Sequence, residues 1–321
     1  MPAMRAPMNA RCSLVVNGQT LRVSPGDTSL ETALADGVIT PMQGLQSGLI
    51  MGQAAAPAGR RLAARARRAE NPTVSIPDAA PLLHTPKAPA RAPVRRVGSV
   101  DAVTALGPRV LQLVVALERR LPFEPGDQVC LTLEGGRPVT LAPTLSVEGG
   151  AELNELVFHL RGACADDLEA LFGVVPTPGL TVKAKGPLGN GTYRPGGGRL
   201  VLVGAETGFA GIWAIARAAR YIEPAREICV IAGARDPLDL YMRPALEWLR
   251  ATGVNRITLA ADRHRQRPPD VRPGPLTAHV PTLRTTDAVH ASGCASTIGA
   301  VEVLAAAAGA RFYPIPLPPG A

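Results

Sequence analysis

The chain has 321 residues, a length that suits two or three domains of ordinary size. Hydrophobic residues make up 46% and aromatic residues only 3%, so the cores must be built from Ala, Val and Leu. The five cysteines are scattered with no C-x-x-C pair, which excludes a disulfide framework and a cysteine-rich metal site. No apolar run reaches about 18 residues and the start lacks a signal-peptide core, so we expect a soluble, cytoplasmic protein with no membrane insertion.

The positive charge belongs to the first third of the chain. The formal net charge is +8, and residues 1–100 hold 12 Lys and Arg against 5 Asp and Glu, whereas residues 101–321 hold 22 against 21. No aromatic residues are interleaved with the arginines at 60–68, and no nucleic-acid-binding fold is apparent, which argues against a nucleic acid as partner. The basic third is better interpreted as a solvated face or a docking surface for an acidic protein partner.

The N-terminal part predicts a small α+β unit over residues 11–78. Residues 12–23 alternate around Asn17-Gly18, a typical hairpin turn, and a short helix is expected to end at Gly37. Proline, alanine and basic residues dominate 79–94, which predicts a linker.

Residues 95–196 predict an antiparallel β-barrel. Short Val- and Leu-rich segments separated by Gly, Pro and Asp turns have the spacing of such a fold. The expected strands are 95–103, 109–118, 127–133, 138–142, 153–160 and 180–185.

Residues 197–321 predict a parallel, doubly wound α/β domain, because apolar strands alternate with helices. The expected strands are 199–204, 227–234, 255–262 and 287–291, and the expected helices are 209–220, 238–252 and 299–309. In the first unit, a turn containing Gly204 and Gly208 leads from strand to helix. Such a turn can bind a pyrophosphate at the helix N-terminus, but it can equally be an ordinary tight connection.

Several motifs in a fixed order resemble the ferredoxin–NADP reductase superfamily. They are F-x-P-G-D (123–127), R-P-V-T (137–140), G-P-L-G (186–189), G-A-E-T-G-F-A (204–210) and G-A-R-D-P-x-D-L-Y (233–241). The likeness is strongest to the iron–sulfur flavoprotein reductases that serve bacterial oxygenases and deoxysugar dehydrases. It implies a degenerate ferredoxin-like β-grasp domain, a flavin-binding barrel and a nicotinamide-binding α/β domain. It also implies FAD and NAD(P)H as cofactors and a redox or oxygenase-type partner.

The resemblance places the ligands of a plant-type [2Fe-2S] cluster in a loop that matches residues 40–53. That stretch contains no cysteine, and such clusters need thiolate ligands. We therefore expect no [2Fe-2S] cluster and no metal site.

For FAD, the resemblance implies the motif R-x-Y-S, which reads Arg137, Val139 and Thr140 here, so the aromatic platform for the flavin is missing. The second phosphate element matches Gly162, but acidic residues follow it in place of a hydroxyl and suit helix caps better than a pyrophosphate site. At the end of the chain, Tyr313 or Phe312 would have to shield the flavin.

For NAD(P)H, the resemblance implies a site at Gly204, Thr207, Gly208, Phe209, Arg235, Ser292 and Gly293. Glu206 replaces a glycine of the family pattern and would repel a phosphate. Arg235 either reaches the cofactor or forms an ion pair with Asp236 or Asp239 in its own loop. His290, two residues before Ser292, replaces a tyrosine of the family pattern and is expected to be structural.

Two functions follow as alternatives. The first is a flavin-dependent NAD(P)H oxidoreductase that transfers electrons but lacks a [2Fe-2S] cluster. The second is a catalytically degenerate reductase-fold protein that serves as an assembly, regulatory or docking subunit. Nucleotide binding without redox chemistry is a third, smaller alternative.

Overall fold

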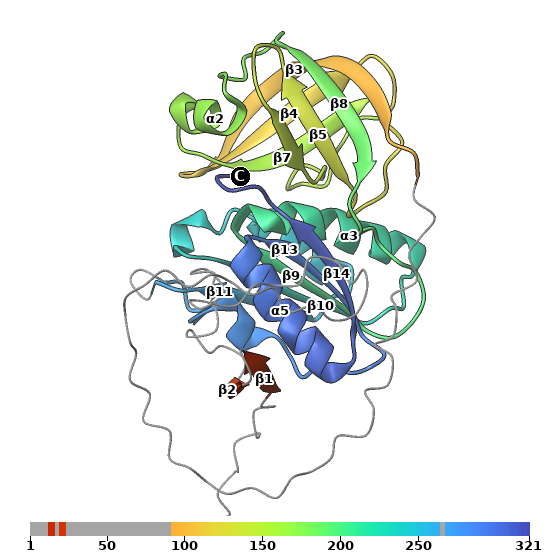
Figure 1. Cartoon of the computed structure of the whole chain (residues 1–321), viewed down its shortest axis with the longest axis vertical. Coiled ribbons are helices and arrows are strands. Elements are labelled where there is room, and N and C mark those ends of the chain that lie inside the picture. Colours follow the sequence, from red (N-terminus) through yellow and green to blue (C-terminus); the bar gives the residue numbers. More distant parts are fainter. Residues whose placement is uncertain (1–11, 17–18, 24–90, 264–266) are drawn as a thin grey trace, which may run out of the picture.

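The structure of this protein is a computed structural model that describes residues 12–16, 19–23, 91–263 and 267–321 (Figure 1). Strands β1 (Cys12–Val16) and β2 (Gln19–Val23) pair in antiparallel fashion with Val16 opposite Gln19, which confirms the hairpin predicted around the Asn-Gly turn. The helix expected to end at Gly37, the loop 40–53 and most of the linker 79–94 lie outside the described residues. The ferredoxin-like domain therefore stays a prediction.

Six antiparallel strands form the barrel at the top of Figure 1, in the order β6-β5-β8-β3-β4-β7. They are β3 (Val94–Gly107), β4 (Val110–Leu117), β5 (Gln128–Leu133), β6 (Pro138–Leu141), β7 (Glu155–Arg161) and β8 (Thr181–Leu188). A single bridge between Thr144, just after β6, and Val157 of β7 joins the two edge strands. All six predicted strands are present, with ends that differ by a few residues.

Alternating side chains of these strands fill the barrel, with Leu113, Leu131, Phe158 and Val182 wholly buried. Helix α2 (Ala165–Phe172) lies at one end of the barrel, and Phe172 at its last position belongs to the same core. The helix therefore closes the barrel and brings its own N-terminus to the end of β7.

Below the barrel lies a parallel sheet of six strands in the order β12-β11-β10-β9-β13-β14. The strands are β9 (Leu200–Ala205), β10 (Ile228–Ala234), β11 (Arg256–Ala261), β12 (Val271–Pro273), β13 (Ala288–Gly293) and β14 (Arg311–Pro316). The helices are α3 (Phe209–Ile222), α4 (Arg243–Ala251) and α5 (Ala295–Ala308), with 3-10 turns η1 (Glu206–Gly208), η2 (Pro237–Asp239) and η3 (Leu276–His279).

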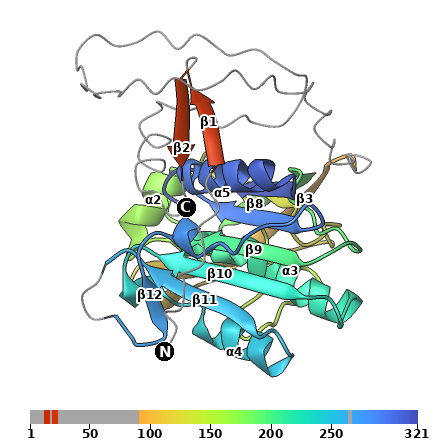
Figure 2. The same cartoon turned by 90° about the horizontal axis from the view of Figure 1, so that it is seen from below.

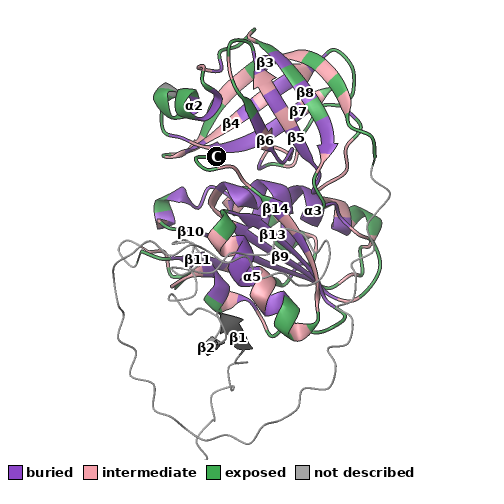
Figure 3. Ribbon diagram, viewed as in Figure 1, coloured by how far each residue is buried: buried purple, intermediate pink, exposed green. Residues whose placement is uncertain are grey.

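Helices cover both faces of this sheet (Figure 2). In β9, Leu200 and Leu202 belong to the core shared with α3 and α4, whereas Val201 and Val203 belong to the core shared with α5. Because successive side chains of a strand point to opposite faces, a fully apolar strand is buried on both sides. Figure 3 shows the resulting purple sheet, with exposed positions on the outer face of α5, whereas α3 is buried over most of its length between sheet and barrel.

The sheet confirms the doubly wound arrangement and adds two strands, β12 and β14, that the apolar pattern did not predict. Strand β14 carries Pro314 and Pro316, which interrupt a strand pattern. Proline is tolerated there because β14 is an edge strand, paired only with β13. Helix α5 begins at Ala295, four residues earlier than expected, and α4 is shorter than expected because η2 precedes it.

None of the helices in the described part of the chain combines the length and the apolar character that crossing a membrane requires.

Candidate functional site

The candidate site lies where the order of the parallel strands reverses. Strand β9 has β10 on one side and β13 on the other, so the carboxyl ends of β9 and β13 form the switch point of the sheet. In open α/β sheets this edge is where ligands bind. Turn η1 continues from β9 at this edge and contacts strand β7 of the barrel, so the switch point faces the junction between barrel and sheet.

The structure brings the predicted NAD(P) residues of both strands together. A Cβ on Gly208 would lie 2.3 Å from the carbonyl oxygen of Ser292, and a Cβ on Gly204 would lie 2.7 Å from the side chain of Ile212. These glycines let the turn pack directly on the end of β13 and let α3 approach β9. Gly293 follows at the end of β13 with φ 151°.

Phe209 and Ser292, two residues predicted for the NAD(P) site, are buried beneath the turn and are not exposed on its surface. Phe209 is fully buried and stacks on Trp213 with ring centroids 6.3 Å apart. Ser292 is also fully buried, and its Oγ has no hydrogen-bond partner among the described residues. An unsatisfied buried hydroxyl is costly, so Ser292 marks a place where hydrogen bonding is incomplete.

Glu206 begins the turn with φ 53°, the only described residue other than glycine with a positive φ. This conformation costs a side-chain-bearing residue about 1 kcal/mol or more. The Glu206 carboxylate lies 3.1 Å from the guanidinium of Arg161, at the end of β7. Glu206 therefore turns toward the barrel and pairs with a cation across the junction.

Arg109, in the turn between β3 and β4, makes a second bridge across the junction. Its guanidinium lies 2.8 Å from Asp239 and 3.3 Å from Asp236, two carboxylates that follow β10. The pKa of Arg109 is raised, first by its hydrogen bond to Asp239. Because the Asp239 side chain is only 7% exposed, Arg109 neutralises a carboxylate that burial would otherwise disfavour.

Arg235 follows β10 and its side chain is exposed. Neighbouring Asp262 has a pKa raised by burial, and the charge of Arg235 opposes that shift. The structure thus places Arg235 beside a carboxylate at the same edge of the sheet. The carboxylates expected from the sequence as its partners, Asp236 and Asp239, pair with Arg109 instead. Contact of Arg235 with a cofactor stays a prediction.

The residues predicted for FAD are not gathered at one point. Arg137 donates from Nε to the carbonyl of Leu171 at 2.8 Å and from Nη2 to the carbonyl of Ala170, so it binds the C-terminal end of α2. Val139 is buried in the barrel core, and Thr140 is half-buried beside it on β6.

Tyr313, the residue expected to shield the flavin, is buried. It is 4% exposed and stacks on the buried His290 at 4.7 Å. Its place in the sheet core corrects the expectation that it shields a flavin, because β14 adds to the sheet and takes the tyrosine with it.

The N-terminus of α2 is capped by the side chain of Asp167, in the first turn of the same helix. Asp167 accepts hydrogen bonds from the backbone N–H groups of Ala163 at 2.7 Å and Cys164 at 3.3 Å. The first of these bonds is the main cause of a lowered pKa for Asp167. A Cβ on Gly162 would lie 3.2 Å from the Cβ of Asp167. Asp167 therefore acts as a cap, as its sequence position indicated.

A cavity of about 360 Å³ opens beside this helix end. Its lining is Arg109, Arg161, Gly162, Ala163, Asp167, Ala170, Leu171, Pro319 and Gly320. Two guanidinium groups in one cavity are a donor set that fits a diphosphate group. The sequence did not single out Arg109 and Arg161, because they lie 52 positions apart and outside every motif.

The last described residues run along the junction (Figure 1). Thr207 donates its hydroxyl to the carbonyl oxygen of Ala321 at 3.0 Å, and the N–H of Leu317 donates to the carbonyl of Gly293 at 3.1 Å. Ala321 also packs against the barrel core. The predicted residues Thr207 and Gly293 are thus engaged by residues 317–321.

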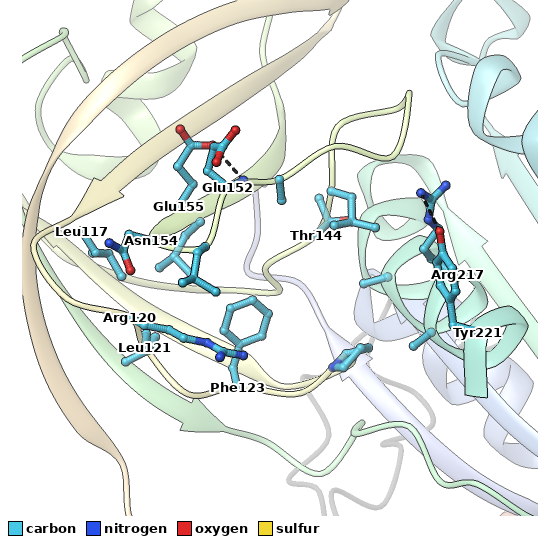
Figure 4. A pocket seen from close by; sticks show the side chains of 17 residues that line it. Leu117, Arg120, Leu121, Phe123, Thr144, Glu152, Asn154, Glu155, Arg217 and Tyr221 are labelled. Carbon is cyan, nitrogen blue, oxygen red and sulfur yellow. Dashed lines mark hydrogen bonds between the residues drawn. The ribbon is translucent and has the colours of Figure 1, made fainter.

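A second cavity of about 330 Å³ lies at the other end of α3, and no predicted site residue lines it. Figure 4 shows Arg120 and Phe123 on one wall, Glu152 and Glu155 on another, and Arg217 on the helix. Arg217 stacks 3.9 Å from the ring centroid of Trp248. This cavity is separate from the switch point of the sheet.

Each of the two sheets buries one histidine completely. His290 donates from Nδ1 to the carbonyl oxygen of Gly191 at 3.0 Å, and Nδ1 of His159 in β7 is hydrogen-bonded to the hydroxyl of Tyr241 at 3.1 Å. Burial lowers the pKa of each histidine to about 3. His290 is therefore a neutral core residue, which agrees with the structural interpretation of the sequence.

Comparison with known proteins gives one informative relative by sequence. The chain is 30% identical over 255 residues to the reductase subunit of an aromatic O-demethylase from Amycolatopsis sp., covering 70% of this chain and 73% of the relative. No family model matches the chain.

Solved structures show the same fold. The Amycolatopsis cytochrome P450 reductase GcoB matches with a TM-score of 0.59 and 24% identity, covering 71% of each chain. The ferredoxin reductase of carbazole 1,9a-dioxygenase matches with a TM-score of 0.55 and 18% identity, covering 71% of this chain and 70% of that one. The order of motifs, the barrel above a doubly wound sheet and the relative at 30% identity agree, and the chain belongs to the ferredoxin–NADP reductase superfamily, among the reductases of oxygenase systems.

Proposed function

We propose that this protein is a flavin-dependent NAD(P)H oxidoreductase that delivers electrons to an oxygenase-type protein partner. The observation that carries the proposal is the junction itself: a glycine-containing turn at the switch point of a parallel sheet faces a cavity with two arginines on the barrel. The similar reductase subunit of an aromatic O-demethylase supports the electron-transfer role.

When bound, FAD would supply the chemistry that couples hydride transfer from NAD(P)H to one-electron transfer. Arg109 and Arg161 would hold its diphosphate, because they line one cavity and carry the guanidinium donors that such a group needs. Thr140 on β6 supplies a hydroxyl on the barrel side. Thr207, Gly208 and Gly293 would bind and orient the nicotinamide nucleotide at the switch point.

The proposal includes the absence of a [2Fe-2S] cluster. Residues 40–53, which match the cluster loop of the family, contain no thiol ligand. Electrons would then leave directly from the flavin to the partner, and the basic residues of the first hundred positions would attract an acidic partner surface.

A docking subunit without turnover is the second candidate, and two observations favour it. Asp167 occupies the N–H groups at the start of α2, and Arg137 is bound to carbonyl groups at its end. Both side chains stand in the stretches that resemble flavin-binding motifs, and both are engaged within the chain itself.

An absorbance experiment distinguishes the two candidates. The chain is purified with added FAD, desalted, and then mixed with NADH or NADPH under anaerobic conditions. Retained flavin bands that bleach on addition of the nucleotide support the reductase. A colourless protein that retains no flavin supports the docking subunit, and a brown preparation with cluster bands would contradict the proposed absence of a [2Fe-2S] centre.

A further inference from the structure

The two arginines in the cavity beside α2 come from separate parts of the barrel and reach toward the sheet. Arg109 lies in the turn between β3 and β4, and Arg161 ends β7. The two segments are tied together, because the N–H of Gly162 donates to the carbonyl oxygen of Arg109 at 3.0 Å. Both guanidinium groups thus open into one space of about 360 Å³.

Arg109 is held in a fixed orientation. Its Nε lies 2.9 Å from Asp239, and its Nη2 contacts both Asp239 and Asp236. Among the described residues, none engages its Nη1, so two of the five donors of this side chain remain available. The carboxylates therefore position Arg109 without using up its capacity to bind an anion.

Arg161 is held more loosely. Its side chain is 43% exposed and its ion pair with Glu206 joins two elements at 3.1 Å. The charge of Arg161 also contributes to the lowered pKa of Asp167, which places Arg161 near carboxylates from both helix-initiating turns. An ion pair this exposed is worth about 1 kcal/mol or less, so a stronger anion can displace Glu206.

Glu206 occupies a positive φ that glycine would adopt more easily. Among the described residues, its carboxylate pairs with Arg161. The strained start of η1 thus holds a carboxylate against one of the two arginines that line the cavity.

We propose that Arg109 and Arg161 bind the diphosphate group of a dinucleotide in this cavity, and that Glu206 competes with the diphosphate for Arg161. This proposal rests on the proposed function and assigns its phosphate-binding residues. A diphosphate offers several charged oxygens to the two planar guanidinium groups, whereas Glu206 offers a single carboxylate to one of them. Binding releases Glu206, and the pair across the junction opens.

The test measures binding by calorimetry, without any redox step. Two arms are run on the full chain: FAD added to the flavin-free protein, and NAD⁺ or NADP⁺ added to the protein supplied with FAD. Arg161→Gln should weaken binding in at least one arm by about tenfold, since a charge-assisted bond to phosphate is lost. Glu206→Gln should strengthen binding in the same arm by about threefold or more, since its competing charge is gone.

A second ion pair provides matched controls. Arg256 and Glu227 lie 2.8 Å apart at the amino ends of β11 and β10, with side chains 58% and 43% exposed. Arg256→Gln and Glu227→Gln make the same charge changes at the opposite edge of the sheet. We expect both to leave the dissociation constants within about twofold of the parent, because the charges there are distant and screened.

Each outcome has one meaning. A loss in the FAD arm assigns the pair to the flavin diphosphate, and a loss in the NAD(P)⁺ arm assigns it to the nicotinamide nucleotide. If the dinucleotides bind but Arg161→Gln and Glu206→Gln behave like the two controls, the inference is overturned and the reductase function stands. If no dinucleotide binds to the parent chain, the reductase function itself fails and the inference falls with it.

Discussion

The barrel and the parallel sheet each present one helix-initiating turn to the junction, and each turn carries a carboxylate. In the barrel, Asp167 accepts two hydrogen bonds from the backbone of its own turn. In the sheet, Glu206 accepts none from its turn and is held by Arg161 of the barrel. The same chemical group therefore has two roles, a local cap in one turn and a contact between the two halves in the other.

The difference teaches which carboxylate a ligand can replace. Displacing Asp167 would leave backbone donors at the start of α2 without partners, so that turn resists a competing anion. Displacing Glu206 breaks only an exposed ion pair and leaves the backbone of η1 unchanged. Two turns that both resemble phosphate sites in sequence can thus differ in whether an anion can bind. The difference depends on whether the carboxylate of the turn is bonded to the turn's own backbone or to a residue elsewhere.

Substituting a glycine in each turn should give the largest difference in unfolding free energy between the two turns. Gly208→Ala places a Cβ 2.3 Å from a backbone oxygen of β13 that cannot move aside, and we expect a loss of about 3 kcal/mol of unfolding free energy. Gly162→Ala meets only the Cβ of Asp167 at 3.2 Å and should cost about 1 kcal/mol or less. Urea unfolding of both variants tests this, and equal losses would contradict the packing at β13.

Lowering the pH should reduce the free energy of unfolding, because the barrel and the parallel sheet each bury a histidine. The pKa of His159 and of His290 is about 3 in the folded chain, against about 6.5 when unfolded. As the pH falls below 6.5 the unfolded chain takes up protons first, so stability is lost progressively down to about pH 3. Between pH 7.5 and 5 each histidine should contribute a loss of about 2 kcal/mol.

Urea unfolding at these two pH values, with His159→Phe and His290→Phe compared to the parent, measures the contribution of each half. Each variant should reduce the pH-dependent loss by about half, because the remaining histidine still titrates. An unchanged loss in both variants would show that other groups cause it.

Removing the carboxylates should give the smallest effects, with different consequences in the two turns. Asp167→Ala removes a helix cap and should cost about 1 kcal/mol, whereas Glu206→Gly should change stability by less than about 1 kcal/mol, because relief of the positive φ offsets the lost ion pair.

The pKa of Asp167 is lowered, so its contribution to stability is present above about pH 4 and disappears as the pH falls through its folded pKa. Thermal unfolding at pH 7 and pH 2 tests this, and a cost for Asp167→Ala that is undiminished at pH 2 would contradict the role of its charge.

Much of the fold could be predicted because local patterns carry it. Continuously apolar strands such as Leu200–Ala205, which are buried on both faces, predict a parallel sheet. The short strands separated by turns within residues 95–196 predict a barrel. Strand β14 could not be predicted this way. Its prolines interrupt a strand pattern, and its place at the sheet edge depends on pairing with β13.

The candidate site was only partly predictable. The glycines at 204 and 208 could be found because close packing leaves a local signature before a helix. Arg109 and Arg161 could not, since a single arginine at a strand end carries no signal until the fold brings it to another. Tyr313 was expected at the flavin and lies in the sheet core, because strand pairing outweighs its sequence neighbourhood.

The sequence by itself determined the two-part reductase architecture, the turn at the switch point and the lack of cysteines in residues 40–53, because these depend on residue types at short spacing. Only the tertiary structure decided which acid caps its own helix, which one binds across the junction and which arginines share a cavity. The ion pair between Arg161 of β7 and Glu206 of η1 joins residues 45 positions apart, and no local sequence pattern specifies it. It forms because of the way the barrel packs on the sheet.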